Sequence, residues 1–126
     1  MSRQTPFRLG LIIRSTAYAQ RSPRTQLDVA LLAASLDCDL NLYFVDASVL
    51  QLIPRGSSRE ALLPAAYRAW ASLPDLFETA ELQVFAEAAW LDRLQASQLQ
   101  PCLPLQACTA GKMRQHWASC NRVLVL

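Results

Sequence analysis

Five apolar runs of strand length alternate along the chain with stretches whose apolar residues recur at helical spacing, and this alternation limits the possible folds most. Strands that alternate with helices build a mostly parallel sheet, and right-handed crossovers then place helices on both of its faces. The 126 residues suffice for one such domain and are too few for two. We therefore expect a single-domain, three-layer α/β/α fold over residues 1–126 with a five-stranded, mostly parallel sheet. The expected strands cover residues 7–13, 40–45, 82–86, 105–108 and 122–126.

The helices are expected between these strands, at residues 25–36, 57–73, 88–96 and 109–119, with a short turn at 46–52. The second helix opens with the capping spacing of Ser57 and Glu60. Its inward side is predicted to carry Tyr67, Trp70, Ala71 and Leu73.

The first helix is apolar almost all round, which predicts two buried sides. One stripe would cover the sheet and consists of Leu27, Ala30, Leu31 and Ala34. The other stripe would contact a second helix or another subunit and is our candidate interface: Val29, Leu32, Ala33 and Leu36.

The composition supports a subunit interface, because 52% of the residues are hydrophobic and only 17% are charged. So few charges leave a large apolar patch on a small domain, and such patches usually bind a protein. The net charge of +2 is too small for a dedicated nucleic-acid binder, so we expect no direct nucleic-acid contact. We find no apolar run that would span a membrane and no secretory signal, so we expect a cytoplasmic protein.

Ligands of parallel sheets sit at the carboxyl ends of the strands. This rule selects Ser15, Thr16, Asp46, Glu87 and Cys108. The chain has only three glycines, and they form neither a dinucleotide fingerprint nor a phosphate-binding loop, so no cofactor is expected.

The four cysteines, Cys38, Cys102, Cys108 and Cys120, are expected as reduced thiols. Together with His116, the last three do not have the short pair spacing of a zinc site, so no metal is expected. Cys108 is the one candidate nucleophile, because a helix starting at Thr109 would favour its thiolate.

Several segments together resemble the DsrE/DsrF-like family of small sulfur-relay proteins, and within it the TusC (DsrF) subunits. These segments are residues 11–16, 26–35, 42–46, 49–54, 67–73 and 121–126, of which Val49-Leu50-Gln51-Leu52-Ile53-Pro54 is the most specific. The resemblance implies a five-stranded parallel sheet between helices. It also implies a heterohexamer with TusB-like and TusD-like subunits that passes persulfide sulfur towards 2-thiolation of the wobble uridine in tRNA.

In such complexes the sulfur-carrying cysteine belongs to the TusD-like subunit, just after its third strand. The matching stretch here, residues 84–88, contains no cysteine. The resemblance therefore implies a non-catalytic subunit that performs no covalent step. Three alternatives remain: a self-sufficient persulfide carrier using Cys108, a DsrEFH-type subunit of sulfur oxidation, and a homo-oligomer that binds a small anion with the loop of residues 14–25.

Overall fold

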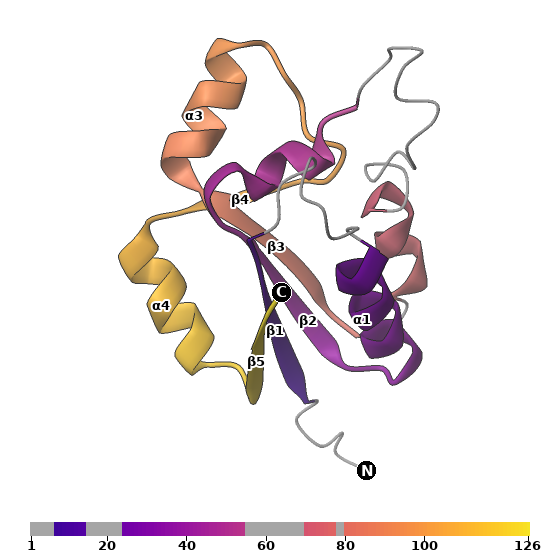
Figure 1. Cartoon of the computed structure of the whole chain (residues 1–126). Coiled ribbons are helices and arrows are strands. Elements are labelled where there is room, and N and C mark those ends of the chain that lie inside the picture. Colours follow the sequence, from indigo (N-terminus) through magenta and orange to yellow (C-terminus); the bar gives the residue numbers. More distant parts are fainter. Residues whose placement is uncertain (1–6, 15–23, 55–69, 78–79) are drawn as a thin grey trace.

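The computed structural model describes residues 7–14, 24–54, 70–77 and 80–126. All of its strands belong to one five-stranded sheet. The strand order is β4-β3-β2-β1-β5, and every neighbouring pair is parallel (Figure 1). This confirms the predicted fold class. The strands are β1 (Arg8–Ile13), β2 (Asp39–Phe44), β3 (Leu82–Glu87), β4 (Gln106–Cys108) and β5 (Arg122–Val125).

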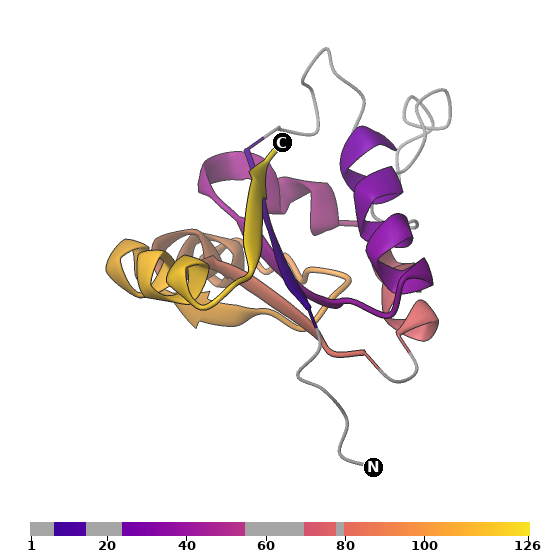
Figure 2. The ribbon, with the colours of Figure 1, turned by 90° about the horizontal axis from the view of Figure 1, so that it is seen from below.

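The helices form a layer on each side of this sheet (Figure 2). The chain moves from β1 to β4 in one direction along the sheet, and the right-handed crossovers leave α1 (Arg24–Ser35) and α3 (Ala88–Ala96) on one face. The return from β4 to β5 leaves α4 (Ala110–Ala118) on the other face. Two short 3-10 helices, η1 (Asp46–Leu52) and η3 (Leu73–Leu76), complete the layer of α1.

The two faces of the sheet differ most clearly on β2, whose six residues are all buried. Leu40, Leu42 and Phe44 point to the face covered by α1, which we call the α1 face. Tyr43 points the other way and joins Ile12 and Phe85 on the α4 face. The α1 face therefore holds the larger apolar core, and α4 is the helix of the described residues that covers the other side.

Helix α1 has one buried side, so the predicted division into two stripes is wrong for two residues. Leu27, Ala30 and Ala33 all pack against the sheet. Ala33 was expected on the outer stripe, whereas Leu31 was expected inside and is 41% exposed. The reason is that an uninterrupted apolar sequence does not reveal which side of a helix faces the sheet.

The segment that follows the undescribed residues 55–69 fixes η3 to the core. Trp70 is fully buried, meets Phe44 edge-on at 5.4 Å between ring centres, and donates its indole N–H to Gln51. Leu73 is buried as predicted, but Ala71 is exposed, because only the side of this short turn with Trp70 meets the sheet. The predicted start of this helix and Tyr67 lie outside the described residues.

Gly10 makes room on the α4 face for the turn between α4 and β5. A Cβ atom at position 10 would lie 3.0 Å from the Cys120 sulfur and 3.3 Å from a methyl group of Val123. A glycine within a strand often marks such a close approach.

Replacing Gly10 with alanine should therefore destabilise the domain by about 1–3 kcal/mol, because the added methyl group overpacks this contact. The matched control is Gly111→Ala on α4, where the new Cβ meets nothing within 4 Å. That variant should gain about 0.5–1 kcal/mol from helix propensity. Urea unfolding of both variants measures the difference, and the double variant Gly10→Ala/Cys120→Ala should recover part of the loss. Equal stability of Gly10→Ala and the wild type would contradict the close approach.

Candidate functional site

Three of the five residues selected from the sequence meet at the carboxyl edge of the sheet. Glu87 and Cys108 are neighbours in the register of β3 and β4. The carboxylate of Glu87 accepts the backbone N–H of Asp46 at 2.6 Å, which joins the end of β3 to the turn after β2. Ser15 and Thr16 lie outside the described residues.

Asp46 has a left-handed backbone with a φ of 51°. This conformation costs an ordinary L-residue about 1–2 kcal/mol and is one that aspartate tolerates better than most. The hydrogen bond to the Glu87 carboxylate offsets part of that cost, although the exposure of Asp46 weakens it. Glu87 thus has a local structural role at the end of the third strand.

Cys108 occupies the predicted place at a strand end before a helix. Thr109 caps α4, and its hydroxyl oxygen accepts the N–H of Lys112 at 3.2 Å. The thiol, however, is only 4% exposed and packs with Phe85 and Met113. Burial raises the pKa of the Cys108 thiol, and the nearby charge of Lys112 opposes this only in part. Its surroundings therefore favour the neutral thiol over the thiolate that a helix start alone would favour.

The remaining thiols are dispersed over the fold. Cys102 packs against the core of the α1 face, whereas Cys120 lies on the α4 face. Burial also raises the pKa of Cys102. None of the four cysteines forms a disulfide, and no three His, Cys, Asp or Glu side chains in the described residues are placed to hold a metal ion.

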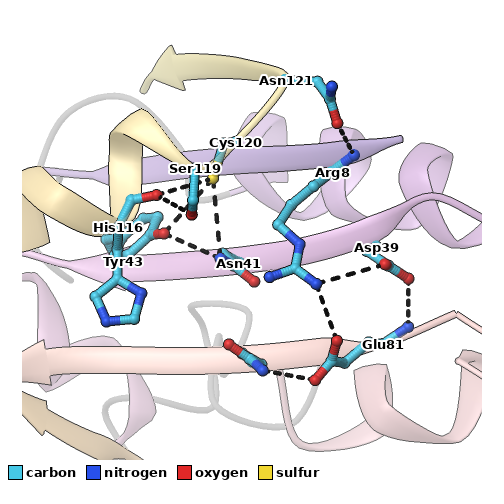
Figure 3. A network of polar contacts seen from close by, with 10 residues as sticks. Arg8, Asp39, Asn41, Tyr43, Glu81, His116, Ser119, Cys120 and Asn121 are labelled. Carbon is cyan, nitrogen blue, oxygen red and sulfur yellow. Dashed lines mark hydrogen bonds and ion pairs between the residues drawn. The ribbon is translucent and has the colours of Figure 1, made fainter. Parts of the chain in front are cut away.

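A polar cluster on the α4 face was not expected from the sequence (Figure 3). The side-chain amide of buried Asn41 donates to the Tyr43 hydroxyl at 3.0 Å and approaches the Cys120 sulfur at 3.8 Å. The same hydroxyl lies 3.6 Å from that sulfur. Burial raises the pKa of Tyr43, so the hydroxyl stays protonated at neutral pH and does not act as a base.

His116 does not complete a catalytic pair with Cys120. Its backbone carbonyl accepts a hydrogen bond from the thiol at 3.6 Å, whereas the imidazole is directed away from the sulfur (Figure 3). The ring instead packs at 4.7 Å from the Phe85 ring centre. The cluster therefore fastens α4 to the sheet, and its members among the described residues place no general base beside the thiol.

A second polar network joins the amino ends of three strands. The guanidinium of Arg8 lies 3.0 Å from the Glu81 carboxylate and 3.6 Å from that of Asp39. Asp39 also accepts the backbone N–H of Glu81 at 2.8 Å, and the Arg8 backbone donates to Asn121 at 2.7 Å. The polar residues that alternate with leucines along β2 were the signal that could have indicated both networks.

The candidate interface residues do not share one environment. Leu32 and Leu36 are 58% and 65% exposed, Val29 is half-buried against the core, and Ala33 is buried. The exposed apolar residues here are Leu31 and Leu32 on α1 and Leu36 directly after it, which we call the α1 patch.

The sheet order and the helix layers define the fold of this chain as three-layer α/β/α with a parallel five-stranded sheet. A solved structure with this fold is the crystal structure of the YchN protein from E. coli, which matches with a TM-score of 0.67 over 95% of this chain and 99% of that one. The two sequences are 16% identical, so the likeness concerns the fold alone. No family model matches the chain, and no curated protein matches its sequence. Among the described residues, no helix is long and apolar enough to cross a membrane.

The raised pKa of Cys108 predicts slow alkylation. At pH 7 to 8 the folded chain should react with iodoacetamide at Cys108 at least about tenfold more slowly than the same residue in urea, since the thiolate is the nucleophile and the site is closed. The rate should rise with pH beyond the range in which an ordinary thiol is already ionised. Peptide mass spectrometry after timed quenching gives both rates. Comparable rates in folded and unfolded protein would show that the thiol is accessible and activated.

Proposed function

We propose that this chain is a non-catalytic subunit of a sulfur-relay complex of the TusBCD type, with partners that resemble TusB and TusD. The observation that carries the proposal is Glu87 at the end of β3, where the resemblance implies a sulfur-carrying cysteine in the catalytic subunit. A carboxylate cannot form a persulfide, and this one already binds the Asp46 backbone. The residue after it, Ala88, begins α3 and brings no thiol either.

The placement of the cysteines supports the same proposal against a self-sufficient carrier. A carrier thiol has to ionise, attack a persulfide and then present the outer sulfur to an acceptor. Cys108 is closed to solvent and its pKa is raised, both of which oppose those steps. Cys120 is more accessible, but the imidazole of His116 is directed away from its sulfur (Figure 3).

The α1 patch supports a role in assembly. Leu31 and Leu32 on α1 and Leu36 directly after it are exposed, and a partner subunit would remove that apolar area from water. Whether the relay serves tRNA thiolation or sulfur oxidation depends on the partners, and we propose the tRNA route because the sequence resembles TusC. The chain would act in the cytoplasm without a cofactor of its own.

A variant with all four cysteines replaced by alanine should retain sulfur transfer if the proposal is correct. We expect the variant, co-expressed with TusB-like and TusD-like subunits, to assemble and to support tRNA 2-thiolation at close to the wild-type rate. The rate is measured by mass spectrometry of nucleosides from tRNA incubated with the complex. Loss of thiolation in an intact complex, reproduced by Cys108→Ala alone, would support the carrier hypothesis instead.

Substituting Leu32 with aspartate should weaken assembly without unfolding the chain. Because Leu32 is 58% exposed, the change should cost the isolated domain less than about 0.5 kcal/mol. In a complex it would bury an unpaired carboxylate, so co-purification with the partners should fall at least about tenfold. Leu99→Asp is the matched control, since Leu99 is also exposed but lies beyond α3. Equal recovery of partners with both variants would remove the α1 patch from the interface.

A further inference from the structure

Among the described residues, no strand pairs with the outer edge of β5, which carries apolar side chains. Strand β5 pairs with β1 alone and forms one margin of the sheet (Figures 1 and 2). Both backbone groups of Leu126 bond to β1, its N–H to Ile12 and its carbonyl to the N–H of Arg14. Because strand residues alternate, the N–H and carbonyl groups of Val123 and Val125 point outwards, and no partner for them lies among the described residues.

Most natural sheet edges are protected by proline, by charges or by a covering element. The opposite edge follows this rule, since β4 has three residues and the segment before it contains Pro101 and Pro104. On β5, by contrast, Leu124 is 38% and Val125 58% exposed. By strand alternation these two side chains lie on opposite faces, so an added strand would find apolar contacts on both sides.

The charged side chains of β5, of the preceding helix α4 and of Arg14 beside the end of β5 are all positive. Arg122 is the first residue of β5, and the backbone of Arg14 is hydrogen-bonded to Leu126, which follows the last residue of the strand. Exposed arginines therefore lie at both ends of a strand about 13 Å long. Lys112 and Arg114 are exposed on α4, which leads into β5. None of these four forms an ion pair within the described part of the chain. No Asp or Glu follows Asp92 in the sequence.

We propose that the β5 edge binds an extended, acidic segment of a partner protein as a sixth strand. Backbone hydrogen bonds to Val123 and Val125 supply the pairing, and carboxylates of the segment meet Arg14 and Arg122. The charge complementarity selects an acidic segment over a second copy of β5, whose own arginine would face the same positive edge. A nucleic acid would satisfy the charges but would leave the outward N–H and carbonyl groups of Val123 and Val125 unpaired. This surface is separate from the α1 patch and does not depend on the proposed relay function.

The test uses the full chain and a fluorescent peptide of about ten residues in which valine alternates with glutamate. Fluorescence anisotropy should give at least about tenfold tighter binding than for the same peptide with lysine in place of glutamate. A version of the acidic peptide that is N-methylated at alternate residues keeps its charge but loses its donors, and it should also bind at least about tenfold more weakly. Hydrogen exchange of the Val123 and Val125 amides should slow on binding of the unmodified peptide.

Variants of the chain separate pairing from charge. Arg14→Gln/Arg122→Gln should weaken binding about tenfold, whereas Arg93→Gln, an exposed arginine on α3, should change it less than about twofold. Val125→Pro removes an outward N–H and should abolish binding. If that variant fails to fold, the methylated peptide still tests on the unchanged protein whether binding needs backbone pairing. Equal binding of the methylated and unmodified peptides would overturn the proposal. Dimerisation of the chain through β5, seen by sedimentation and lost in Val125→Pro, would also overturn the proposal. Preferential binding of a single-stranded oligonucleotide would overturn it as well.

Discussion

The structure depends on the burial of β2 on both faces. Leu40, Leu42 and Phe44 meet the helices of the α1 face, while Asn41 and Tyr43 lie beneath α4. Each face is completed by an aromatic contact: Tyr43 stacks on Phe85 at 5.2 Å between ring centres, and Phe44 meets Trp70 edge-on. A central parallel strand is closed to water on both sides, so the loss of a helix from either layer would expose the strand. The layers of helices are therefore coupled through one strand of six residues.

Much of this architecture could be predicted from the sequence because strand and helix periods alternate clearly. The strand at residues 82–86 and the helix at 88–96 agree with β3 and α3 to within one residue. The side of α1 that faces the sheet could not be predicted, since Leu31 and Ala33 are both apolar and only tertiary packing decides between them. Ala71 illustrates the same difficulty, because one turn of helix has too few residues for a hydrophobic period to orient it.

The positions of the candidate site residues could be predicted from the sequence, but their contacts and burial could not. Chain topology placed Asp46, Glu87 and Cys108 together at the carboxyl edge, and the capping threonine located the helix start beside Cys108. The protonation state of the Cys108 thiol could not be predicted from the sequence. A helix start favours the thiolate whereas burial opposes it, and the sequence does not show how deeply the thiol is buried. The alternation along β2 marks Asn41 and Tyr43 as residues of one polar network, but their contact with Cys120 joins positions 77 to 79 residues apart, so the pattern does not identify the cysteine as their partner.

The chemistry at the end of β3 connects the fold to the proposed role. A strand end before a helix is a favourable place for a nucleophile, because the helix start stabilises an anion there. In this chain that place holds the carboxylate of Glu87, which accepts the backbone N–H of Asp46, a residue with a left-handed backbone. A position that would activate a thiol is occupied here by a carboxylate, and the hydrogen bond of this carboxylate holds the ends of β2 and β3 together. In the complex that we propose, a subunit with this arrangement would keep the shape of the edge for its neighbours and would leave the covalent step to a partner.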